Sequence, residues 1–105
     1  MVLCIDTSDS QKTVVGLKTK NGKLLDRLIE ERKYGSQVIL PQITKILKKN
    51  KKKLSDLAAI EVNVGPGSYT GLRVGLAVAN ALAWALKLPI NGKKKGELVY
   101  PIYEK

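Results

Sequence analysis

The sequence contains no histidine among its 105 residues. This absence excludes Ser-His-Asp and Cys-His catalysis, which need an imidazole base, and every zinc site that uses imidazole ligands. Cys4 is the sole cysteine, so a cysteine zinc site and an internal disulfide are excluded as well. A single cysteine is also typical of a reducing compartment. Chemistry is therefore left to carboxylates, hydroxyls, lysines and backbone amides, and no metal or cofactor is expected.

Long apolar runs are also lacking. The most apolar stretch, residues 71–88, is interrupted by Arg73, Asn80 and Lys87, whereas a membrane span needs roughly 18–20 apolar residues. The N-terminus has neither a basic segment nor a cleavage site, so we expect no signal peptide. These features predict a cytoplasmic protein without membrane contact. The length is that of one domain with a core of its own.

Acidic residues are scarce: nine oppose 19 lysines and arginines, which gives a net charge of +10. The lysines cluster over residues 45–53 and 93–95. One interpretation is a solvated helix end and a solvated loop. The other is attraction to RNA phosphates, for which the candidates are Lys48, Lys49, Lys51 and Lys52. The one tryptophan and four tyrosines do not alternate with the lysines, so stacking on single-stranded bases is not indicated.

The hydrophobic pattern predicts an α/β fold with a mixed five-stranded sheet and two main helices. Asn21-Gly22 is a strong hairpin signal, so the first three strands should form an antiparallel meander. The fourth strand follows a helix, which favours a parallel, right-handed return beside the first strand. The predicted elements are strands over 2–5, 13–19 and 24–30, a helix over 36–49, a strand over 58–64, a helix over 70–87 and an extended segment over 98–103.

Two polar loops follow predicted strands, at residues 6–8 and 65–71. Ligands bind at the carboxyl ends of parallel strands, and a helix N-terminus attracts anions. The candidate anion-binding residues are Gly65, Gly67, Ser68 and Thr70. The alternative is a tight turn with Ser68 or Thr70 as the N-cap. The glycine spacing is neither a Walker A motif nor G-x-G-x-x-G.

Two reactive side chains near the N-terminus are given structural roles by their context. Asp6 stands alone as a carboxylate at a strand end, where it is better explained by the hydrogen bonds of a turn than by catalysis. Cys4 lies within an apolar strand and is predicted to be a core residue.

The second helix is rich in small residues. Gly71, Gly75 and Ala79 recur every four residues on one face, and Ala77, Ala81 and Ala85 form a second ridge. Two helical glycines cost roughly 1 kcal/mol each, so a close approach by a neighbour should offset that cost. We predict that one side meets the protein's own sheet and that the other meets either the protein's own first helix or another chain, and we favour a helix-pair surface that extends to a partner. A bulky residue at Gly75 should then block the partner and leave the monomer folded.

Four motifs, which follow one another along the chain, resemble motifs of the TsaB (YeaZ) family. The most specific is the Gly-Pro-Gly-Ser-aromatic-Thr-Gly-x-Arg stretch at residues 65–73, and the tail at 99–103 is similar to the family's closing strand. The motifs are residues 3–8, Ser36-Gln37 with Leu40-Pro41, residues 54–57 and residues 65–77.

The resemblance implies an actin-like (ASKHA, ribonuclease H-like) fold and a role in forming threonylcarbamoyladenosine (t6A) at position 37 of tRNA. It implies a non-catalytic subunit that binds the catalytic TsaD through helices 36–49 and 70–86, helps recruit the ATPase TsaE, and contacts tRNA only within that complex. A homodimer through the same helices is also implied. The implied partner-binding residues are Ser36, Gln37, Leu40, Ile43, Leu47, Thr70, Gly71, Arg73, Val74, Gly75, Val78, Ala79 and Leu82.

The sequence departs from the family in length, because family members usually have two actin-like halves. Here we expect one truncated domain over 1–105, with residues 1–92 as the first half, a basic loop at 93–97 and a closing strand at 98–105. A nucleotide cleft between two halves is then not expected. The alternative function is a small basic domain that binds tRNA or another nucleic acid through its lysine clusters.

Overall fold

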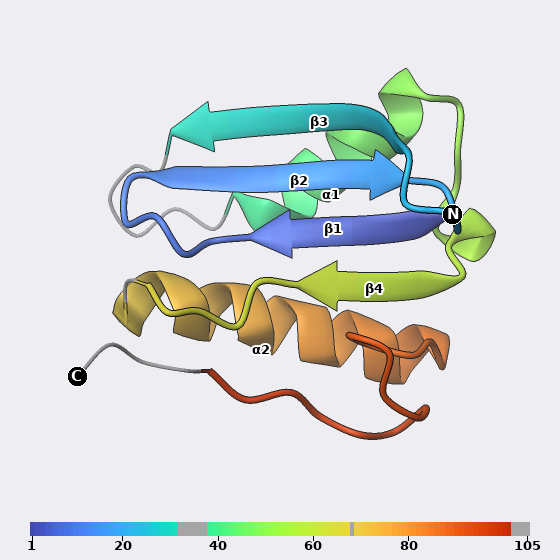
Figure 1. The fold of residues 1–105 in the computed structure, drawn as a ribbon. Coiled ribbons are helices and arrows are strands. Elements are labelled where there is room, and N and C mark those ends of the chain that lie inside the picture. Colours follow the sequence, from blue (N-terminus) through green and yellow to red (C-terminus); the bar gives the residue numbers. More distant parts are fainter. Residues whose placement is uncertain (32–37, 68, 102–105) are drawn as a thin grey trace.

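The computed structural model describes residues 1–31, 38–67 and 69–101. Four strands form one sheet in the order β3-β2-β1-β4 (Figure 1). β1 and β2 pair antiparallel, as do β2 and β3, whereas β4 lies parallel to β1. The predicted meander and the parallel return are therefore confirmed. The strands are β1 (Val2–Asp6), β2 (Lys12–Lys18), β3 (Leu24–Glu31) and β4 (Ala59–Val62).

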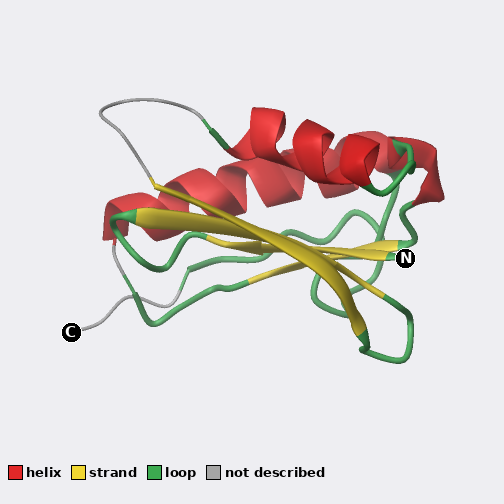
Figure 2. Ribbon diagram, turned by 90° about the horizontal axis from the view of Figure 1, so that it is seen from above, coloured by secondary structure: helices red, strands yellow, loops and turns green. Residues whose placement is uncertain are grey.

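Both helices lie on one face of the sheet (Figure 2). They are α1 (Ile39–Lys49) and α2 (Tyr69–Leu86), and a 3-10 turn, η1 (Leu54–Asp56), leads into β4. α1 begins at Ile39, so Pro41 is its third residue, where the missing N–H has no partner within the helix. Ser36 and Gln37, where the sequence predicted the helix to start, lie outside the described residues.

The core lies between this sheet face and the two helices. Alternation along β2 turns Thr13, Val15 and Leu17 toward the helices, and all three are buried. α1 supplies a buried stripe at helical spacing, and α2 covers the strands beside it. The largest fully buried apolar side chains are Leu3, Ile5, Leu17, Ile46, Ile60, Leu72 and Ile90.

The predicted five-stranded sheet is observed with four strands. Within the described residues, the C-terminal segment that was predicted to be the fifth strand pairs with no strand. The outer edge of β4 is occupied instead by the short segment that follows α2. Ile60 N–H donates to Pro89 O at 3.0 Å, and Asn91 N–H donates to Ile60 O at 2.9 Å. The Asn91 amide then pairs with both backbone groups of Val62, at 2.8 and 3.0 Å. The backbone of Asn91 is left-handed (φ 50°), so the chain turns away from the sheet there.

Replacing Asn91 with glycine should lower the free energy of unfolding by about 2 kcal/mol, because two hydrogen bonds to Val62 are lost. Glycine accepts the left-handed backbone, so the loss reports the amide alone. Urea denaturation followed by far-UV circular dichroism measures it. Lys87→Gly is the matched control, since Lys87 also has positive φ and lies exposed, and it should not destabilise. Equal midpoints for Asn91→Gly and wild type would contradict the edge-pairing role.

Candidate functional site

The two polar loops meet at the carboxyl ends of β1 and β4, as the parallel pairing requires. The buried Thr7 hydroxyl donates a 2.6 Å hydrogen bond to Gly71 O, which ties the first loop to the first turn of α2. Asn63 Nδ2 donates to Ser8 Oγ at 3.3 Å. The loops are therefore held against each other by groups of this chain.

The glycines of the second loop have packing roles in this arrangement. A Cβ on Gly67 would lie 2.7 Å from Ser8 Cβ, and one on Gly75 would collide with Thr7 Oγ1. Gly65 has a left-handed backbone, with φ 110°. These contacts favour the tight-turn interpretation. Anion binding at Gly65, Gly67 and Thr70 stays a prediction, and Ser68, its fourth candidate, lies outside the described residues.

Asp6 serves the turn that follows β1. Its Oδ1 accepts hydrogen bonds from Ser8 N–H at 2.9 Å and from Ser8 Oγ at 2.7 Å. Partial burial works to raise the pKa of Asp6, but the hydrogen bonds from Ser8 and Asn63 outweigh it and lower the pKa below the ordinary 3.8. Within the described part of the chain, no three His, Cys, Asp or Glu side chains gather as metal ligands. The turn role predicted for Asp6 agrees with this geometry.

The Asp6 carboxylate should make stability depend on pH. Because its pKa is lowered by folding, the ionised form stabilises the fold fully above pH 3.8 and progressively less as the pH falls below it. We expect Asp6→Asn to cost about 1 kcal/mol near neutral pH and less at pH of about 3. Urea denaturation at both values measures this. In a Ser8→Ala background the pH-dependent part should shrink; a pH-independent cost in both backgrounds would contradict the assignment.

α2 turns its first small-residue ridge toward the protein's own core. Thr7 packs against Gly75, so the close approach expected from the glycines is made by this chain. Five members of the implied partner-binding set are covered by the protein itself in this way, and their contact with a partner stays a prediction. These buried residues are Ile43, Leu47, Gly71, Gly75 and Ala79.

The second ridge of α2 faces outward. Ala77, Ala81 and Ala85 are exposed, and we call them the alanine ridge. Val74, Val78 and Leu82 flank it, half-buried against the core. Of the other partner-binding residues that the family resemblance implies, Leu40, Thr70 and Arg73 are exposed. Ser36 and Gln37 lie outside the described residues.

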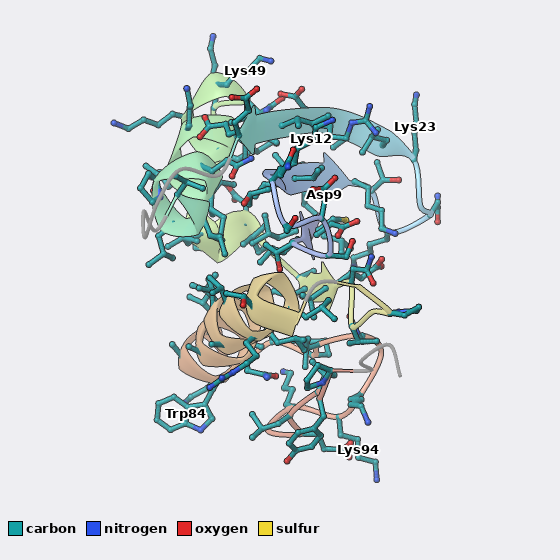
Figure 3. All side chains as sticks on the ribbon, turned by 90° about the vertical axis from the view of Figure 1, so that its left-hand side faces the viewer. Asp9, Lys12, Lys23, Lys49, Trp84 and Lys94 are labelled. Atoms are coloured by element: carbon teal, nitrogen blue, oxygen red, sulfur yellow. The ribbon has the colours of Figure 1, made fainter. Side chains whose placement is uncertain are left out.

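Trp84 was missed by the sequence analysis. It lies on α2 next to the alanine ridge, 73% exposed, and Figure 3 shows it projecting into solvent at the lower left. Tryptophan is highly buried on average, and it is enriched where proteins bind partners. A helical wheel could have found it, because it shares the outward stripe with Ala77 and Ala81.

A cluster of exposed lysines lies at the C-terminal end of α1 and in the residues that follow it. Lys48, Lys49, Lys51 and Lys52 all reach solvent, but Lys49 pairs with Asp26 at 3.3 Å. Hydrogen bonds from Asn50 and from Arg27 N–H lower the pKa of Asp26, so the carboxylate is kept charged beside the cluster. Basic side chains here also suit the negative pole of the helix. Their contact with RNA stays a prediction.

Cys4 departs from its predicted place in the core. It is half-buried on the sheet face away from the helices, where it lines a cavity of ≈ 370 Å³. Nearby, Lys18 Nζ and Glu61 Oε1 form an ion pair at 2.6 Å. Burial raises the pKa of the Cys4 thiol, which disfavours the nucleophilic thiolate. The sequence missed this because alternation along β1 sends Cys4 to the face opposite Leu3 and Ile5.

None of the helices among the described residues is both long and apolar enough to cross a bilayer.

Comparisons with known proteins agree with this architecture. The family model described as "TsaD: tRNA N6-adenosine threonylcarbamoyltransferase" matches residues 9–94. A "tRNA threonylcarbamoyladenosine biosynthesis protein TsaB" from Buchnera aphidicola subsp. Schizaphis graminum is 37% identical over 93 residues, which cover 88% of this chain and 43% of that protein. The Bacillus subtilis protein of the same name is 31% identical over 98% of this chain and 49% of its own length.

Among solved structures, YeaZ from Pseudomonas aeruginosa superimposes with a TM-score of 0.74 and 32% identity, over 85% of this chain and 42% of that one. The chain thus spans less than half the length of these relatives. The shared fold is of the actin-like type, as the sequence resemblance implied. The chain belongs to the TsaB (YeaZ) family, within the wider group that the TsaD family model describes.

Proposed function

We propose that this chain is a non-catalytic subunit in the formation of tRNA threonylcarbamoyladenosine, and that it docks on a TsaD-like catalytic subunit through the alanine ridge of α2. The observation that carries the proposal is the exposure of Ala77, Ala81 and Ala85 on a helix whose glycine ridge is already used by the protein's own core. The names of the relatives, which refer to threonylcarbamoyladenosine biosynthesis, supply the pathway.

The alanine ridge suits a helix or sheet of another protein. Small side chains let a partner backbone approach closely, and the half-buried Val74, Val78 and Leu82 beside them add apolar area. Leu40, in the first turn of α1, is a further exposed apolar side chain on the helices. The net charge of +10 opposes the docking of two copies, so a different partner is favoured over a homodimer.

A non-catalytic role is supported by what the reactive side chains do. Asp6 is engaged by Ser8, and the pKa of Cys4 is raised by burial. Neither group is poised as a base or a nucleophile. We therefore assign the chemistry to the TsaD-like subunit, with a TsaE-like ATPase and tRNA joining the assembled complex.

Size-exclusion chromatography with light scattering tests the proposal. The chain is mixed with the TsaD-like protein of the same organism, and each protein is also run alone. We expect one peak whose mass is the sum of the two subunits, and a monomer mass for the chain by itself. Separate elution at concentrations of tens of micromolar would contradict docking. A dimer mass for the chain alone that disappears on mixing would show that a homodimer competes for the same face.

A further inference from the structure

The C-terminal segment is fixed along α2 by a side-chain clamp. Asn80 Nδ2 donates to Val99 O, and Val99 N–H donates to Asn80 Oδ1, both at 3.0 Å. Val99 is buried by the contact, and the segment runs beside α2 in Figure 1. Its neighbours Leu98 and Tyr100 are left outside, because successive side chains of an extended chain point to opposite sides. The tail is therefore a positioned part of the surface.

Two aromatic side chains flank this clamp. Tyr100 is 72% exposed and follows Val99 directly. Trp84, 73% exposed, lies one helical turn beyond Asn80 on the same side of α2. Within the described residues, these two are the exposed aromatic side chains, and Leu98, 46% exposed, adds apolar area beside them. Rings left this open offer flat faces to a ligand.

Lysines border the same surface. Two turns, closed by hydrogen bonds from Lys93 N–H to Ile90 O at 3.0 Å and from Glu97 N–H to Lys94 O at 3.1 Å, carry the exposed run of lysines at residues 93–95. Gly92 and Gly96 have left-handed backbones in these turns. In Figure 3, Trp84 projects at the lower left and Lys94 lies at the lower right, both in the lower half of the molecule, whereas Lys49 lies at the top.

We propose that this surface, formed by Trp84, Tyr100 and residues 93–95, binds unpaired nucleotides of RNA; the choice of RNA rests on the proposed function. Bases stack on the exposed rings, and the lysines attract the phosphates that link those bases. Paired bases hide their faces within a helix, so the rings select single-stranded nucleotides. An acidic protein segment would satisfy the lysines and leave the two ring faces without a matching group.

The structure favours this surface over the lysines at the end of α1. There, Lys45 pairs with Glu30 at 3.2 Å and Lys49 pairs with Asp26 at 3.3 Å, so carboxylates of β3 already neutralise part of the charge. None of the exposed aromatic side chains of the described residues lies on α1. The sequence could not show the aromatic neighbours of residues 93–95, because Asn80 brings Tyr100 to α2 through a contact across 19 positions.

Trp84 is the only tryptophan, so its fluorescence reports directly on the proposed contact. The full chain is titrated with a single-stranded RNA of roughly twelve nucleotides, long enough for one binding surface. We expect quenching as a base stacks on the indole, with an affinity that falls as salt rises, at a logarithmic slope of about −2 for three phosphates. Tyr100→Ala should weaken binding about tenfold.

Two charge-matched triple variants give the control. Lys93→Gln with Lys94→Gln and Lys95→Gln should weaken binding at least about tenfold, whereas the same change at Lys48, Lys51 and Lys52 should alter it less than about twofold. Equal losses from the two triple variants would overturn the proposal, as would binding seen by mobility shift without quenching. Equal quenching by double-stranded RNA would overturn the choice of unpaired nucleotides. Circular dichroism checks that each variant is folded.

The test of RNA binding and the test of docking can succeed or fail independently of each other. RNA binding is measured on this chain alone, and docking is measured on its mixture with the TsaD-like protein. Loss of RNA binding with intact docking overturns only the present inference. Intact RNA binding without docking overturns the docking role and leaves this surface in place.

Discussion

Replacing Gly75 with alanine is expected to destabilise the protein by about 2 kcal/mol. A Cβ at this position collides with Thr7 Oγ1 and lies 3.1 Å from both Thr7 Cβ and Thr7 Cγ2, so rotation of the threonine side chain gives no relief. Overpacking of this kind costs typically about 1–3 kcal/mol. The Thr7–Gly71 hydrogen bond, worth about 1 kcal/mol, is also disturbed. Alanine's better helix propensity returns only about 1 kcal/mol.

Urea denaturation followed by far-UV circular dichroism measures the effect, because Trp84 is too exposed to report unfolding well. Thr7→Ala removes the atoms in the way, so Gly75→Ala should cost much less in that background. Thr7→Ser removes Cγ2, so its hydroxyl can rotate away at the loss of the hydrogen bond to Gly71 O, and this variant should give only partial relief. A Gly75→Ala protein as stable as wild type would mean that the helix lies farther from β1 than the structure places it.

The same contact shows what sequence reasoning could and could not predict about α2. Spacing alone revealed two small-residue ridges and a need for close approach. It could not tell which ridge meets the protein's own chain, because that depends on Thr7, which lies 64 positions before the Gly71 carbonyl that it contacts. The contact with Thr7 therefore argues against a bulky residue at Gly75 sparing the monomer, and the partner surface that we propose is the alanine ridge.

Elements governed by local pattern were predicted well. The hydrophobic pattern gave each strand of the sheet within two residues, and Asn21-Gly22 marked a hairpin in which Gly22 has φ 88°. The predicted fifth strand does not form among the described residues, and the reason is non-local. Its sequence has strand character, but Asn80 takes both backbone groups of Val99, and Asn91 occupies the edge of β4. Cys4 was misplaced because a period of two does not say which face carries the helices.

Replacing Ala81 with glutamate should weaken binding to a TsaD-like partner about a hundredfold or more. The position is central to the alanine ridge, so docking would bury a carboxylate with no partner group and hold the two backbones apart. An uncompensated buried charge costs about 3–5 kcal/mol, and each 1.4 kcal/mol is about tenfold in affinity. The free chain should keep its stability, because an exposed helical position accepts glutamate at little cost.

Isothermal titration calorimetry against the TsaD-like protein measures the loss. Ala81→Ser keeps the side chain small and should bind within a few-fold of wild type. Lys20→Gln lowers the net charge by the same single unit on the exposed β2–β3 hairpin, away from the helix layer, and should also bind normally. Ala81→Ser thus tests the effect of a small polar side chain at this position, and Lys20→Gln tests the effect of net charge. If Ala81→Glu binds with wild-type affinity, a TsaD-like protein docks elsewhere. The open sheet face that carries Cys4 and the Lys18–Glu61 pair would then be the next surface to test.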